Sequence, residues 1–143
     1  MPRRWLIAIL GAAAGTAAVA YAARRLDAVA VRGLSMAPAL LPGDRLLVVR
    51  HRGRLRPGHV VVVSDPRNAT RELVKRVSTL DAGRVSLLGD NRAESTDTRV
   101  FGPFPASAVR WRAVLRYWPP SRIGFVPSSI STGSDPAAHA LSG

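Results

Sequence analysis

The N-terminal stretch of this chain most restricts what it can fold into. Residues 5–23 carry no charged side chain, and pairs of arginines at positions 3–4 and 24–25 bound them. A helix of that length, rising about 1.5 Å per residue, reaches roughly the 30 Å thickness of a bilayer's hydrocarbon core. The alternative is a cleaved secretory signal peptide, whose apolar part is usually only about 7–15 residues long. We therefore predict that residues 1–25 form an uncleaved, single-pass membrane anchor.

Length and composition limit the rest of the chain to one domain with few options for chemistry. The 143 residues leave no room for a second sizeable core. The absence of cysteine excludes disulfides, thiolate zinc sites and a cysteine nucleophile. Three histidines lie scattered at positions 51, 59 and 139, an arrangement that offers little for a metal site or a Ser-His-Asp triad. We expect neither a metal nor a cofactor.

The chain is strongly basic, with a formal net charge of +12 at pH 7. A non-enzymatic, membrane-anchored basic domain that binds anionic lipid or nucleic acid would explain this charge, and residues 50–56 supply a dense run of arginines. Nucleic acid is disfavoured because aromatic residues make up only 6% and no nucleic-acid-binding motif accompanies the charge. Lys75 is the single lysine among 21 basic side chains. It stands apart because arginine keeps its proton in proteins, whereas a desolvated lysine can lose its own.

Beyond the anchor the sequence has the pattern of short β-strands. Two Pro-Gly turns, at 42–43 and 57–58, each precede an apolar run rich in valine. We predict a mostly β fold: a small antiparallel, barrel-like domain over residues 29–124, preceded by one N-terminal transmembrane helix. Residues 125–143 are rich in Ser, Pro, Gly and Ala and are predicted to form a disordered tail. The segments that we expect to be strands are 44–50, 59–63, 71–78, 84–88 and 108–118.

Two side chains of this domain are candidates for nucleophilic chemistry. Ser35 lies in an irregular segment near the surface, where a serine is commonly a turn or cap residue. A serine hydroxyl needs a base before it can act as a nucleophile, and Lys75 could be that base. Its neighbours on the same strand face, Leu73 and Val77, would strip water from the ammonium, and burial lowers the pKa of a lysine from its usual value of about 10.4. The competing interpretation is a lysine whose stem packs while its charge reaches solvent.

A third segment, residues 89–103, is dense in Gly, Asn, Asp and Ser and predicts a structured turn before the last strand. Ser95, Asp97 and Arg99 alternate within it, so they could form a network of hydrogen bonds and ion pairs beside the reacting groups. The competing interpretation is an ordinary turn rich in Asp and Asn.

Together these segments resemble the signal peptidase I family of membrane-bound serine proteases, from Val31 to about Gly124 and in the same order along the chain. The closing Trp118-Pro119-Pro120 looks most like the mitochondrial inner-membrane branch of that family. The other matching pieces are Ser35-Met36-x-Pro38-x-Leu40, Pro42-Gly43-Asp44, Lys75-Arg76-Val77, Gly89-Asp90-Asn91, Ser95-x-Asp97-x-Arg99 and Phe101-Gly102-Pro103.

The resemblance implies a Ser-Lys dyad, with Ser35 as the nucleophile and Lys75 as the general base. It further implies that Ser95 hydrogen-bonds the lysine amine, that Asp97 and Arg99 support the site, and that the backbone N–H of Ser35 belongs to the oxyanion hole. Some relatives add a serine hydroxyl two positions before the nucleophile, where this chain has Gly33. Met36 could pack near the membrane-facing surface or in the core. The remaining motif residues are expected to be structural: Pro38, Gly43, Asp44, Gly89, Asp90 and Asn91.

Only 13 residues separate Lys75 from Gly89, so the large inserted β-subdomain of many bacterial members is absent. The resemblance therefore implies a minimal endopeptidase that removes N-terminal signal peptides or propeptides from preproteins with small residues before the cleavage site. Its expected partners are those preproteins and the lipid bilayer; nucleic acid is not expected, and the oligomeric state stays open.

Two alternatives within protease chemistry concern the substrate. Short relatives look like the proteases that remove the propeptide of nickel-containing superoxide dismutase. Self-cleavage, as in repressor-type Ser-Lys proteases, is disfavoured because those proteins carry a DNA-binding helical segment where this chain has its apolar span. We expect the domain on the extracytoplasmic side of the cell membrane, although the nearly balanced flanking arginines do not fix this orientation.

Overall fold

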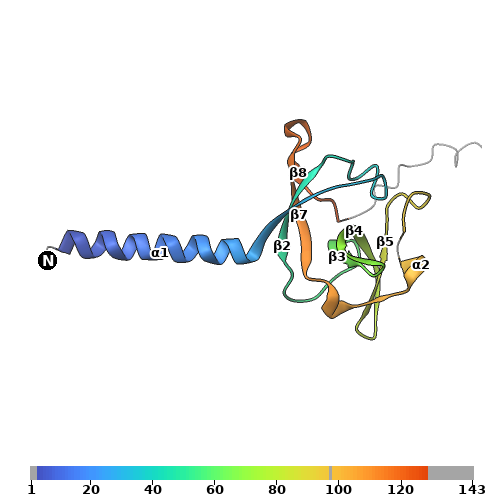
Figure 1. Cartoon of the computed structure of the whole chain (residues 1–143), viewed down its shortest axis with the longest axis horizontal. Coiled ribbons are helices and arrows are strands. Elements are labelled where there is room, and N and C mark those ends of the chain that lie inside the picture. Colours follow the sequence, from blue (N-terminus) through green and yellow to red (C-terminus); the bar gives the residue numbers. More distant parts are fainter. Residues whose placement is uncertain (1–2, 97, 129–143) are drawn as a thin grey trace, which may run out of the picture.

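The computed structural model describes residues 3–96 and 98–128 and consists of one long helix that leads into a β domain (Figure 1). Helix α1 spans Arg3–Arg25, and none of its residues is buried against the rest of the chain. Its length and apolar composition are sufficient to cross a membrane. The helix thus coincides with the uncharged stretch from which the anchor was predicted.

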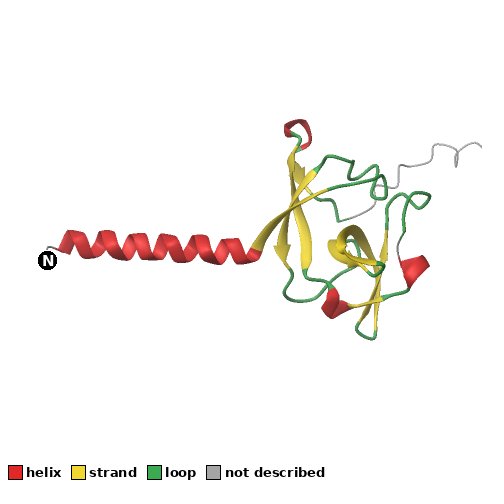
Figure 2. Ribbon diagram, in the orientation of Figure 1, coloured by secondary structure: helices red, strands yellow, loops and turns green. Residues whose placement is uncertain are grey.

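The β domain is built on one antiparallel sheet, shown in yellow in Figure 2. Its strand order is β1-β2-β7-β3-β4-β5-β6, and β8 pairs with β7. The strands are β1 Leu26–Ala30, β2 Arg45–Arg50, β3 Val60–Asp65, β4 Asn68–Asp81, β5 Arg84–Leu88, β6 Phe104–Pro105, β7 Trp111–Trp118 and β8 Gly124–Phe125. Short helical segments are α2 Thr98–Phe101 and the 3₁₀ turns η1 Ala106–Ala108 and η2 Pro120–Arg122.

The predicted mostly β, antiparallel architecture is confirmed, and each of the predicted strand segments overlaps an observed strand. The sheet is not closed, however: within the described residues it runs from β1 at one edge to β6 at the other. The order is also non-sequential, because β7 inserts between β2 and β3. The described part of the domain is therefore an open sheet rather than a complete barrel, with β1 at one of its edges.

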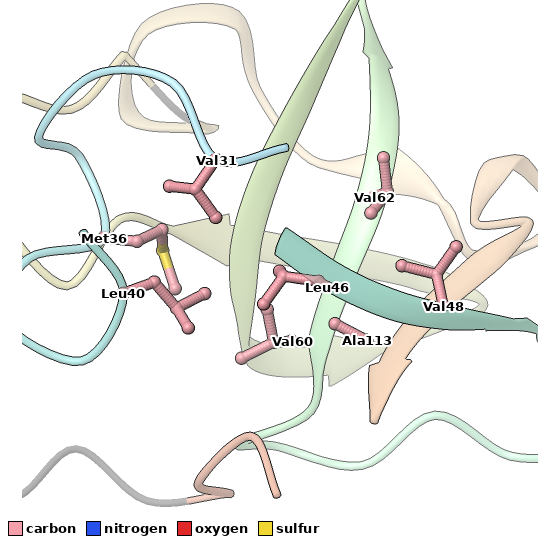
Figure 3. Packing of buried hydrophobic residues seen from close by; sticks show 8 residues of the cluster. All are labelled: Val31, Met36, Leu40, Leu46, Val48, Val60, Val62 and Ala113. Carbon is pink, nitrogen blue, oxygen red and sulfur yellow. The ribbon is translucent and has the colours of Figure 1, made fainter. Parts of the chain in front are cut away.

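The core consists of two clusters of apolar side chains on opposite faces of β3. Val60 and Val62 belong to the first cluster, and Val61 and Val63 to the second, so β3 is buried on both faces. This explains why its sequence is a continuous run of valines rather than an alternation. Figure 3 shows the first cluster, which consists of Val31, Met36, Leu40, Leu46, Val48, Val60, Val62 and Ala113.

The chain continues to contact the domain after the last strand. Phe125 pairs with Leu115, the Val126 N–H donates to the Val114 carbonyl at 3.1 Å, and Pro127 accepts a hydrogen bond from Arg76. The first residues of the predicted tail, 125–128, thus lie against the sheet. Residues 129–143, the remainder of that prediction, lie outside the described part of the chain.

Candidate active site

Ser35 lies in the connection between β1 and β2, and this connection is fastened at its base. The Val31 N–H donates to the Asp44 carbonyl at 2.8 Å, and the Gly43 N–H donates back to the Val31 carbonyl at 3.1 Å. Directly after Ser35, the side chain of Met36 is only 1% exposed and packs in the first core cluster. The core interpretation of Met36 therefore holds. Its burial anchors the half-buried serine beside it.

Lys75 is buried near the middle of β4. Lys75 is only 2% exposed and pairs with Val61 on β3. The buried Leu73 and Val77 flank it, as the alternation predicted. The ammonium does not reach solvent as the competing interpretation required. Instead, Nζ donates a hydrogen bond to the Ser95 hydroxyl at 2.9 Å.

The Gly89-Asp90-Asn91 turn joins the serine segment to the lysine segment. The Asn91 N–H donates to the Ser35 carbonyl at 2.9 Å. A Cβ added to Gly89 would overlap the Ser95 hydroxyl and would lie 2.6 Å from the Ser35 carbonyl oxygen. Only a glycine backbone can pass this close to both groups. The fold therefore brings Ser35, Gly89, Ser95 and Lys75 together, although they are far apart in the sequence.

The loop that carries Ser95 is fixed on both sides. The Thr98 hydroxyl accepts a hydrogen bond from the Leu87 N–H at 3.1 Å and donates to the Leu87 carbonyl at 2.9 Å. Arg99 donates to the Arg92 carbonyl at 3.1 Å, which ties the two ends of the loop. Asp97 lies outside the described residues. Thr98 was not a predicted site residue, although its place between Asp97 and Arg99 in the motif was a usable signal.

Arg76 and Asp90 form a buried ion pair that holds the turn to β4. Their side chains are 5% and 2% exposed, and two hydrogen bonds of 2.8 and 2.7 Å join guanidinium and carboxylate. Arg76 also donates to the Gly58 carbonyl at 2.9 Å and to the Pro127 carbonyl at 2.6 Å. Asp90 is thus a structural residue, as expected, and it compensates the charge of Arg76 beside Lys75.

Asp44 likewise holds the serine segment in place through a buried carboxylate. This carboxylate accepts hydrogen bonds from the Leu41 N–H at 2.9 Å and from Arg122 at 2.8 and 3.1 Å. Arg116 lies 3.4 Å away on the same carboxylate. Gly43 forms the turn before Asp44, and Pro38 is exposed in the preceding loop. The Pro-Gly-Asp motif therefore fixes the β1–β2 connection to η2, the turn that begins at the last proline of Trp118-Pro119-Pro120.

A groove of about 990 Å³ connects these elements, and both Ser35 and Lys75 line it. One wall is β1 with the segment through Gly33, and the other is residues 68–75 of β4. Both walls are strand edges, because β1 ends the sheet and β4 pairs with β5 only from Arg76 onward. Within the described residues, no group of three or more His, Cys, Asp or Glu side chains is placed to hold a metal ion.

Comparison with known proteins identifies the family. The family model for signal peptidase, peptidase S26, matches residues 3–81 and 78–118. The chain is 37% identical over 120 residues to mitochondrial ATP-independent inner membrane protease subunit 1a of Arabidopsis thaliana, covering 66% of this chain and 71% of that protein. It is 29% identical over 120 residues to the human mitochondrial inner membrane protease subunit 1, covering 68% and 72%, and 29% identical over 133 residues to subunit 2 of the Saccharomyces cerevisiae protease, covering 73% and 75%. The chain therefore belongs to the signal peptidase family, peptidase S26.

Proposed function

We propose that this signal peptidase family member is a serine endopeptidase that works with a Ser35–Lys75 dyad. The observation that carries the proposal is the buried Lys75, whose Nζ donates to Ser95 at 2.9 Å and which lines the same groove as Ser35. Burial disfavours a charged ammonium. A neutral amine at this place is the one base that the motif supplies for the serine hydroxyl.

The reaction is an acyl transfer in two halves. The Ser35 Oγ attacks the scissile carbonyl while the Lys75 amine takes the hydroxyl proton. The resulting ammonium returns that proton to the leaving amine as the C–N bond breaks, which leaves an ester on Ser35. Lys75 then deprotonates a water molecule that attacks the ester. As the ester C–O bond breaks, the Lys75 ammonium returns that proton to the Ser35 oxygen, and the new carboxylic product leaves. Ser95, by accepting a hydrogen bond from Nζ, directs the amine within the groove.

The backbone N–H of Ser35 is our proposed donor to the oxyanion, a contribution typically worth about 2.7–4 kcal/mol. Gly33 cannot supply the side-chain hydroxyl that some relatives have. Its φ of +73° lies in the left-handed region that favours glycine, so a serine there would require a different backbone. The absence of that hydroxyl is thus linked to the conformation of the loop.

The substrate that fits the groove is an extended peptide. Within the described residues, the strand edges on β1 and on residues 68–74 of β4 offer backbone donors and acceptors to a chain that adds as a strand. The ends of signal peptides and propeptides, with small residues before the cleavage site, are the family's substrates. An anchor at α1 would hold the dyad close to preproteins in the same bilayer and raise their effective concentration.

The test compares Ser35→Ala, Lys75→Ala and Lys75→Arg for cleavage of a preprotein by the full-length protein in proteoliposomes. Each should lower kcat/KM at least about 1,000-fold. Lys75→Arg is the sharpest variant because it keeps a long basic side chain but cannot supply a neutral amine. Ser86→Ala, a half-buried serine on β5 outside the groove lining, is the matched control. Thermal unfolding must confirm that each variant is folded; a folded Lys75→Arg protein with wild-type activity would contradict the assignment of the base.

A further inference from the structure

The connection between β2 and β3 presents a row of arginines that the dyad does not use. We call residues 50–56 the arginine loop; Arg50, Arg52, Arg54 and Arg56 are all exposed in it. Leu55, only 8% exposed, inserts into the second core cluster. The loop is thus pinned to the domain by one apolar side chain while its cations face outward.

The position of this loop follows from the strand register. Leu26, the first residue after α1, pairs with Val49 on β2, and Arg50 comes next in the chain. Helix α1 itself ends with Arg24 and Arg25. Figure 1 shows the connection between β2 and β3 at the end of the domain nearest α1. If α1 spans a bilayer, the arginine loop lies at the level of the lipid headgroups.

Within the described part of the chain, residues 3–96 and 98–128, no carboxylate pairs with the charges of the loop's four arginines. A second cavity, of about 430 Å³, opens beside the loop. Its wall combines Arg54 and His51 with the apolar Leu55, Leu80 and Val109. A cavity with a cationic rim and apolar walls suits an amphiphile with an anionic headgroup.

We propose that the arginine loop binds the phosphates of anionic phospholipids in the bilayer that holds α1. Guanidinium groups match phosphate oxygens in a fork geometry, and a basic residue near an anionic surface strengthens binding about fivefold. Because the loop follows the strand that pairs with β1, a docked loop would also fix how the domain is turned about the helix. The substrate groove, which β1 lines, would then keep a constant orientation to the membrane.

The chain's lack of cysteine permits a direct test in the full-length protein. A donor dye on Ser107→Cys, an exposed residue that lines the second cavity, reports energy transfer to a headgroup-labelled lipid. The protein is reconstituted in vesicles of phosphatidylcholine alone or with about a third phosphatidylglycerol. Transfer should rise in the anionic vesicles and fall again in about 0.5 M salt, which shortens the screening length.

Two triple variants separate the loop from overall charge. The loop variant replaces Arg52, Arg54 and Arg56 by Gln, and the control variant replaces the exposed Arg45, Arg67 and Arg84 by Gln. For the loop variant, the docked-to-undocked ratio in anionic vesicles should fall on the order of 100-fold, while the control should keep the wild-type response.

Equal losses in both triple variants would overturn the proposal, as would transfer that is unchanged by phosphatidylglycerol or by salt. The measurement needs no proteolysis, and Ser35→Ala should dock as the wild type does. Failure of the docking test therefore leaves the proposed dyad untouched, and failure of the dyad leaves the docking test intact.

Discussion

At the scale of single residues, the site depends on how closely backbones approach one another. Ser35 and Lys75 come from different segments, and Gly89 is the residue that packs against both the Ser35 carbonyl and the Ser95 hydroxyl. The hydrogen bond from Asn91 to Ser35 fixes the same contact. Alignment of the proposed dyad therefore rests on a glycine that has no side chain to take part in the chemistry.

Replacing Gly89 by Ala should disable the site without unfolding the protein. The new methyl group would overlap Ser95 and press on Ser35, so the turn must move. We expect kcat/KM to fall at least about 100-fold, with a loss of about 1–3 kcal/mol in the free energy of unfolding. Gly124→Ala is the matched control, because a Cβ there meets no atom within 4 Å and the backbone has no positive φ. Unchanged cleavage by Gly89→Ala would exclude this close contact in the working enzyme.

The sequence predicted the residues of the proposed dyad, but it did not predict the ion pairs that support them. Motif order placed Ser35, Lys75 and Ser95 together, and alternation on the strand predicted that Lys75 is buried. It could not reveal that Asp44 pairs with Arg122, since that contact joins residues 78 positions apart. A local pattern records which face a side chain occupies, whereas the partner of a buried charge is set by tertiary packing.

At the scale of elements, strands with strong local signals were predictable and weakly marked ones were not. The valine run of β3 and the alternation of β7 were both recognised from their apolar patterns. β1 begins at Leu26, before the expected domain boundary at 29, because no turn residue separates it from α1. β6 and β8 are only two residues long and leave no periodic signal. Sheet closure and the insertion of β7 depend on long-range pairing, which local patterns do not encode.

The ion pair between Arg76 and Asp90 should be a major link between β4 and the turn after β5. Asp90→Asn leaves a buried guanidinium without its counter-charge, which typically costs about 3–5 kcal/mol in the free energy of unfolding. Chemical denaturation of the full-length protein in detergent micelles measures this cost. Asp81→Asn, an exposed carboxylate at the end of β4, should change stability by less than about 0.5 kcal/mol. The double variant Arg76→Met/Asp90→Leu should lose less free energy of unfolding than Asp90→Asn alone. A larger loss would contradict the interpretation that the ion pair is desolvated.

His59, just before β3, should make the domain sensitive to mild acid. Partial burial, with the positive charges of Arg112, His51 and Arg56, lowers the pKa of His59 below its ordinary value of 6.5. The unfolded chain therefore takes up this proton at a higher pH than the folded domain does. Stability should be fully present above about pH 6.5 and should decline as the pH falls from there toward the folded-state pKa. His59→Asn should flatten that decline in thermal unfolding; an identical slope in the variant would assign it to other groups.

At the scale of the whole molecule, the helix, the arginine loop and the groove form one arrangement around β1. β1 follows α1 directly, pairs with the strand that ends at Arg50, and lines the groove with residues 28–30. A membrane at α1 would thus set the distance of both the arginine loop and the site from the bilayer surface. The side of the membrane on which the site lies determines which substrates can reach it.

We expect the β domain on the extracytoplasmic side, where the ends of exported preproteins emerge. Because the chain contains no cysteine, one introduced cysteine reports its own location. Ser121→Cys, exposed on η2, should react with a membrane-impermeant maleimide in intact cells, whereas a cysteine placed at position 2 should react only after the cells are opened. The reverse pattern would put Ser35 and Lys75 in the cytoplasm. Substrates would then be precursors that never cross the membrane, such as the propeptide-bearing form of a nickel superoxide dismutase, and the assignment to exported preproteins would have to be abandoned.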